Sequence, residues 1–174
     1  MKTKLDLLPR FSTDDADRAF NEWGANCGPG AIAAICGLTL DEVRGHMGDF
    51  ESKGYTNPTL LYAALDSIGV RYQKLRPVAW PGYGLVRVVW EGPWAAPNVP
   101  ARAWYRHTHW IGTAVINRDR GVFDINCMNN GVGWVAFTEW AGNIAPFLAR
   151  QEPKATGEWH IVNGVEVAPR EETK

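Results

Sequence analysis

Cys27 stands directly before Gly28-Pro29-Gly30, at the predicted start of an apolar helix that runs to Cys36. Unpaired N–H groups and the dipole at a helix start favour negative charge, so a thiol there ionises more easily. The glycines leave room for a substrate carbonyl, and backbone N–H groups at such a place can face a developing oxyanion. Cys27 is therefore the candidate nucleophile, although a cysteine taken at random is more often a small buried residue. Cys36 and Cys127 keep that second interpretation.

His109 opens the apolar run from Trp110 to Val115, which is predicted to be a buried strand. A histidine there can point into a cleft while the strand holds it still. It can take the proton of Cys27 and later give it to a leaving amine. A capping or core histidine is the competing interpretation. His107 lies two residues earlier, but an H-x-H pattern without further ligand spacing predicts no metal, and no other cofactor is indicated.

Asp124 is a carboxylate among apolar neighbours in the predicted strand 122–126, a placement that normally needs a partner. A histidine partner would satisfy it, and the acid would hold the imidazole in the right tautomer. An ideal hairpin centred on Asp119 would set His109 opposite a position near 129, so a bulge or a shifted turn is needed to bring Asp124 to His109. The alternatives for this orienting role are Asn126, Asn129 and Asn130.

Helices are predicted in the first part of the chain and strands in the second. Helix starts are indicated at Ser12 or Thr13, at Cys27, at the capping box Thr39-Leu40-Asp41-Glu42 and at 56–59. Strands are predicted at 70–75, 85–90, 110–116, 122–126 and 134–137, with Asn163-Gly164 as the turn of a final hairpin. This order indicates one α+β domain over residues 1–174, helical at about 12–69 and an antiparallel sheet at about 70–168.

Several segments together resemble the papain-like cysteine peptidase superfamily, most closely the stand-alone relatives of the bacterial double-glycine-leader (bacteriocin-processing) peptidases. They are Asn26 to Gly30, Thr39 to Arg44, Pro58 to Gly69, His109 to Ile111 and Val122 to Asp124. The order Cys, His, Asp and the 15-residue step from His109 to Asp124 match the family, and the resemblance covers roughly residues 18–145. It implies a papain-like fold in which a helical lobe carrying the nucleophile packs on an antiparallel sheet carrying the base and the acid.

The chain departs from this family in two respects. The family places a glutamine six residues before the cysteine to help hold the oxyanion, and here that position is Asn21, one methylene shorter. Three alternatives follow: Asn21 is the oxyanion donor, Asn26 substitutes for it, or the oxyanion hole is weak. Losing one such donor typically costs ~100- to 1000-fold in rate. The family's peptidases are fused to membrane transporters, whereas no run of about 18 apolar residues occurs in this chain.

The resemblance implies a soluble bacterial or phage cysteine hydrolase, a peptidase, isopeptidase or amidase, that acts on a peptide or protein. Two alternatives stay open: a catalytically weak or inactive papain-fold protein that works as a binding or inhibitory module, and a thiol-dependent acyltransferase or deamidase. Aromatic residues around His109 are candidates for walls of the substrate cleft, although packing under a loop explains them equally well. The candidates are Trp90, Trp94, Trp104 and Trp110.

Composition excludes several other functions. The net charge is −1 and no basic stripe occurs, so a nucleic-acid partner is not predicted. The sequence contains no signal-peptide core and no membrane span. We therefore expect a cytoplasmic location and no membrane partner. Three cysteines cannot all pair internally, which favours a reducing compartment. The sequence does not predict the oligomeric state.

Overall fold

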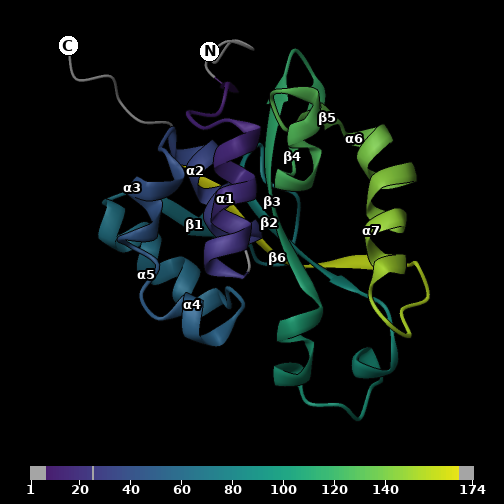
Figure 1. The fold of residues 1–174 in the computed structure, drawn as a ribbon. Helices are drawn as coiled ribbons and strands as arrows, with labels where there is room; N and C mark the ends of the chain where they lie inside the picture. The colour runs from purple at the N-terminus through teal and green to yellow at the C-terminus, as the bar shows by residue number, and fades with distance from the viewer. Residues whose placement is uncertain (1–6, 25, 169–174) are drawn as a thin grey trace, which may run out of the picture.

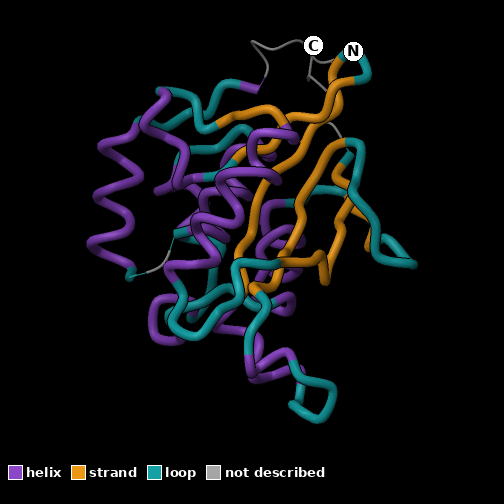
Figure 2. Tube along the Cα trace, turned by 90° about the vertical axis from the view of Figure 1, so that its right-hand side faces the viewer, coloured by secondary structure: helices purple, strands orange, loops and turns teal. Residues whose placement is uncertain are grey.

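The computed structural model describes residues 7–24 and 26–168, and its centre is a six-stranded sheet. The strand order is β1-β6-β2-β3-β4-β5, and every neighbouring pair is antiparallel. Figure 2 shows the strands running side by side through the molecule. The bounds are Tyr72–Lys74 (β1), Tyr83–Trp90 (β2), Thr108–Ile116 (β3), Asp119–Phe123 (β4), Trp134–Ala136 (β5) and Trp159–Val167 (β6). The predicted α+β class is confirmed.

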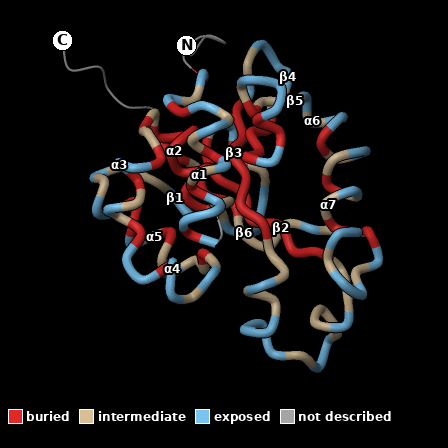
Figure 3. Tube along the Cα trace, viewed as in Figure 1, coloured by how far each residue is buried: buried red, intermediate tan, exposed pale blue. Residues whose placement is uncertain are grey.

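Helices lie on both sides of this sheet (Figure 1). On one side are α1 (Thr13–Trp23), α2 (Cys27–Cys36), α3 (Leu40–Arg44), α4 (Phe50–Lys53) and α5 (Pro58–Ile68). On the other are α6 (Phe137–Glu139), a π-helical turn (Trp140–Ile144) and α7 (Ala145–Gln151). Buried residues gather between these layers (Figure 3) and form two apolar clusters, one under each helical layer. Among the described helices none is long and apolar enough to cross a lipid bilayer.

Local sequence explains where the first helices begin. Ser12 and Asp15 form a capping box at the start of α1, and Thr39 and Glu42 form one at the start of α3, so backbone N–H groups that lack a partner within the helix are satisfied. Gly37 ends α2 in the left-handed conformation (φ 63°), which glycine adopts at little cost. These predicted boundaries are confirmed.

The helix α2 is buried on all sides: each residue from Gly28 to Cys36 is buried, as its apolar sequence predicts. Its two glycines allow this close packing. A side chain at Gly30 would place its Cβ 2.5 Å from Ile125 Cδ1, and one at Gly28 would overlap the buried Thr56 side chain. The glycines beside Cys27 therefore let the start of α2 enter the core.

We expect Gly28→Ala to lower the free energy of unfolding by about 1–3 kcal/mol, because the added methyl forces Thr56 or α2 to shift in a packed core. Denaturant unfolding followed by circular dichroism measures this change. Gly142→Ala is the matched control, since nothing lies within 4 Å of a Cβ there. Equal unfolding midpoints for Gly28→Ala and wild type would contradict the packing argument.

The predicted hairpin turn at Asn163-Gly164 is wrong. These residues lie within β6, which runs unbroken from Trp159 to Val167 and pairs with both β1 and β2. A Cβ at Gly164 would overlap the carbonyl of Ala79, so this glycine permits a close approach of the chain and does not form a turn.

Candidate active site

The first residues of β3 lie at an open edge of the sheet. Among the described strands, β4 is the neighbour of β3 on this side, and it pairs with β3 only from Gly112 to Ile116. His109 and Trp110 come before this paired stretch. The start of α2 and the chain leaving β4 can therefore both approach them.

His109 and Asp124 meet at this edge. His109 Nε2 lies 3.0 Å from Asp124 Oδ1, and both side chains are buried, with exposures of 7 % and 0 %. The turn between β3 and β4 is formed by Asn117 and Arg118, both with positive φ (51° and 75°). This turn comes earlier than the predicted centre at Asp119, so the register continued from Gly112 and Phe123 sets His109 opposite residue 126 instead of 129. The shifted turn brings Asp124 within reach.

The Asp124 carboxylate accepts hydrogen bonds from two further residues. Asn126 donates to Oδ1 from its backbone N (3.0 Å) and from Nδ2 (3.1 Å), and Trp140 Nε1 donates to Oδ2 (2.8 Å). Burial alone would raise the pKa of this carboxyl, but His109 and these donors outweigh it and hold the pKa below its ordinary value. Asp124 is therefore ionised and held in a single orientation.

The three asparagines considered as alternatives take other places. Asn126 supports Asp124, as described above. The Asn130 side chain accepts from Val132 N and Gly133 N and so closes the loop after it, and Asn129 is exposed. The structure thus brings Asp124, and none of the asparagines, to His109 Nε2.

Cys27 completes the group from the start of α2, where its side chain is partly exposed. Because Asp124 occupies Nε2 of His109, Nδ1 is the ring nitrogen left for the sulfur. Burial alone would raise the pKa of the thiol, but the hydrogen bond and charge of His109 and the backbone N–H of Trp110 lower it below its ordinary value. On the β4 side, β3 has no paired strand at Trp110, which leaves room there for the start of α2.

His109 shows the opposite shift. Burial alone would lower its pKa, but the charge and hydrogen bond of Asp124, together with Cys27, raise the pKa to about 10. The Trp90 ring stacks on the imidazole, with 5.7 Å between ring centroids and 22° between planes. A lowered thiol pKa and a raised imidazole pKa favour a thiolate–imidazolium pair at neutral pH, which is the reactive form of a cysteine nucleophile.

The four tryptophans expected at the substrate cleft take different positions. Trp90 is 7 % exposed and covers His109, while Trp94 is half-buried, donates to the Trp90 carbonyl (2.6 Å) and stacks on His107. Trp104 is also half-buried, and its Nε1 has no partner among the described residues. The Trp110 side chain is 1 % exposed and donates to the Thr56 carbonyl (2.7 Å), so it lies in the core and joins the sheet to the helical layer.

The expected oxyanion donors are both near the nucleophile in the chain but differ in environment. Asn21 is exposed in the last turn of α1. Asn26 is half-buried, and its Nδ2 donates to the Ala16 carbonyl at 2.9 Å, which ties the start of α2 to α1. The structure thus gives Asn26 a structural hydrogen bond and leaves the Asn21 amide facing solvent.

His107 does not share a strand face with His109. It ends the 3₁₀ helix η3 (Ala101–His107), where its Nδ1 lies 2.8 Å from Glu152 Oε1. In the part of the chain that the structure describes, no three His, Cys, Asp or Glu side chains gather as metal ligands would.

Two residues of this region were missed in the sequence analysis. Trp140 donates to Asp124 across 16 positions of the chain, and no local pattern predicts that contact. Arg87, on β2 beside Trp110, is 4 % exposed. In the sequence Arg87 is the single charged residue in the apolar run Leu85 to Trp90. This pattern indicates a buried charge that needs a partner.

Compared with known proteins, the chain matches no family model and no curated sequence.

Proposed function

We propose that this chain is a papain-like cysteine hydrolase that cleaves peptide or isopeptide amide bonds, with Cys27 as nucleophile, His109 as base and acid, and Asp124 as the residue that orients His109. The observation that supports it most is the hydrogen-bonded pair of His109 and Asp124 at the open edge of β3, with His109 lowering the pKa of the Cys27 thiol. The three residues come from α2, β3 and the chain after β4, as the family resemblance implies.

In the proposed reaction the Cys27 thiolate attacks the carbonyl carbon of the scissile amide, and the carbonyl π electrons move to oxygen. The tetrahedral intermediate collapses as the protonated His109 gives its proton to the leaving amine, which yields a thioester and a free amine. Water then attacks the thioester while His109 takes its proton. Cys27 leaves as thiolate beside the protonated His109, which restores the starting pair, and the product is released as carboxylic acid.

The backbone N–H of Cys27 at the start of α2 and the Asn21 amide are the proposed oxyanion donors. A helix start supplies unpaired N–H groups and a positive dipole end without rearrangement. Asn21 is exposed in the last turn of α1, and its side chain is one methylene shorter than the glutamine of the family.

The alkylation rate of Cys27 should follow a characteristic pH profile. Because its thiol pKa is lowered, the rate rises with pH through a value below that of an ordinary cysteine. Hydrolysis also needs a protonated His109, so it falls as pH rises through about 10. Iodoacetamide labelling followed by mass spectrometry measures the rise of the rate with pH. Turnover of a peptide amide measures both changes, because its leaving amine needs the proton of His109. The buried Cys36 and Cys127 are internal controls, since burial raises the Cys127 pKa to about 12.

Equal labelling of the three cysteines at neutral pH, or labelling that begins only above the ordinary thiol pKa, would contradict the proposal. It would mean that His109 does not stabilise the thiolate.

A binding module that keeps the fold without useful turnover is the second candidate. The two candidate oxyanion donors favour this alternative, because Asn26 already donates to the Ala16 carbonyl and the Asn21 side chain is exposed. The two functions differ in one respect: only the hydrolase needs the sulfur of Cys27. Transfer or deamidation shares the thioester and is distinguished by mass analysis of the products.

A further inference from the structure

Arg87 is a buried cation without adequate partners. Its side chain is 4 % exposed, and neither Nε nor Nη2 has a hydrogen-bond partner among the described residues. Nη1 lies 3.5 Å from Asn163 Oδ1, at the limit of a hydrogen bond. No ion pair within residues 7–24 and 26–168 includes it. A buried guanidinium is retained at a high free-energy cost unless an anion and its acceptors satisfy it.

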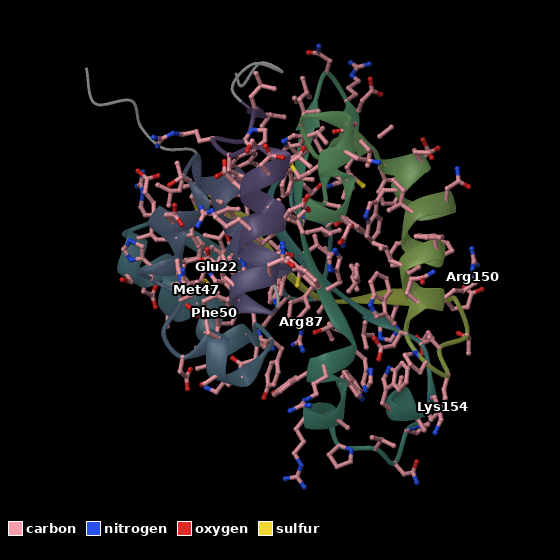
Figure 4. All side chains as sticks on the ribbon, viewed as in Figure 1. Glu22, Met47, Phe50, Arg87, Arg150 and Lys154 are labelled. Atoms are coloured by element: carbon pink, nitrogen blue, oxygen red, sulfur yellow. The ribbon has the colours of Figure 1, made fainter. Side chains whose placement is uncertain are left out.

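Arg87 lies beside the proposed active site. It pairs with Trp110 across the β2–β3 ladder, one residue beyond His109. In Figure 4 the labelled Arg87 lies between the helical layer and the lower end of β3. Burial lowers its pKa to about 10, and the opposing charges that raise it include the Cys27 thiolate. The guanidinium is therefore protonated at neutral pH and within electrostatic range of the nucleophile.

The backbone at Arg87 is irregular. Arg87 faces Asn163 on β6, but the next residue, Val88, faces Ile161, so β6 contains an extra residue at this point. Such bulges re-aim side chains and are frequent beside active sites. On the other side, the Tyr105 ring lies 5.0 Å from the guanidinium carbon and contacts Tyr55 from the helical side. Tyr105 is only half-buried and belongs to a 3₁₀ helix, so its side chain can turn aside.

We infer that Arg87 binds a carboxylate of the substrate close to the scissile bond, reached when the Tyr105 ring turns away. The planar guanidinium fork with two free donors matches a carboxylate in bidentate geometry. This carboxylate is either an acidic side chain or the carboxyl terminus of the substrate, and both present the same chemistry. The inference deepens the proposed hydrolase and rests on it.

Alkylation rates measured with matched acid and amide reagents test this inference. Cys27 is alkylated with N-iodoacetylglycine and with N-iodoacetylglycinamide, and separately with the N-iodoacetyl derivatives of glutamic acid α-amide and glutamine α-amide. The first pair presents a terminal carboxylate and the second a side-chain carboxylate. The ratio of acid to amide rates cancels any effect of Arg87 on thiolate formation, because both reagents meet the same thiolate.

We expect Arg87→Gln to lower this ratio by about 10- to 100-fold, the range for losing a charged hydrogen-bonded pair. Arg87→Lys keeps the positive charge but lacks the planar guanidinium group, so its rate ratio should lie between those of wild type and Arg87→Gln. Tyr105→Ala should leave the ratio unchanged or raise it. Arg106→Gln is the control, since Arg106 is an exposed arginine on the same 3₁₀ helix as Tyr105. An unchanged ratio in Arg87→Gln, or an equal fall in Arg106→Gln, would overturn the inference.

Thermal unfolding supplies a second measurement that does not need a reactive thiol. N-acetylglycine, but not N-acetylglycinamide at the same ionic strength, should raise the unfolding temperature of Cys27→Ala, and adding Arg87→Met should abolish this shift. Arg87→Met should itself unfold at a higher temperature than wild type, by roughly 2 °C or more, because it removes an unsatisfied buried charge. A lower unfolding temperature with no acid-dependent shift would make Arg87 a structural residue. If no reagent alkylates Cys27 but N-acetylglycine still raises the unfolding temperature, the proposed hydrolase is wrong and Arg87 still binds a carboxylate.

Discussion

Replacing Cys27 by alanine is expected to lower hydrolysis of a p-nitrophenyl ester, or of a peptide library, by roughly 10⁴-fold or more. Without the sulfur no thioester forms, and the remaining groups only hold the substrate. The fold should persist, because the side chain is partly exposed and its replacement leaves little space unfilled. Mass spectrometry of the wild-type reaction should also detect an acyl adduct on the peptide that contains Cys27.

Cys36→Ala is the matched control for this experiment. Cys36 lies at the other end of the same helix, is buried, and is remote in sequence from His109. Its loss should affect stability and leave turnover nearly unchanged. If Cys27→Ala instead keeps the full biological activity of the protein, the binding module is the better description.

Asp124→Asn is expected to lower turnover by roughly 10³- to 10⁴-fold, with the fold retained. A neutral amide does not stabilise the His109 imidazolium. Its NH₂ group would face either the N–H of Trp140 or the donors of both His109 and Asn126, so at least one donor on the protein loses its acceptor. The pH range over which the enzyme turns over should become narrower at both its acidic and its basic end. The Cys27 pKa rises as its imidazolium partner is lost, and the His109 pKa falls from about 10.

Trp140→Phe is the companion variant. It removes one of the hydrogen bonds to Asp124 and keeps the carboxylate, so turnover should fall by only about 10-fold. A pH profile that moves in Asp124→Asn and stays in place in Trp140→Phe identifies the charge of Asp124 as the cause. Unchanged turnover in Asp124→Asn would contradict its role as the orienting residue.

The sequence alone determined the features that depend on neighbouring residues. Capping residues at Ser12 and Thr39 set the starts of α1 and α3, and the glycine-bearing start of α2 placed a thiol at a helix terminus. The residue types also named His109 and Asp124 as partners, since a carboxylate among apolar residues needs a cation or donors. These inferences follow from local propensity and chemistry, which short segments express by themselves.

Only the tertiary structure decided how these segments meet. The two-residue turn at Asn117 and Arg118 set the register that brings Asp124 to His109, and β6 proved to be one strand because β1 and β2 pair along it. The same holds for the Trp140 hydrogen bond and for the burial of Arg87. Strand pairing and burial depend on residues far apart in the chain, so no short pattern encodes them.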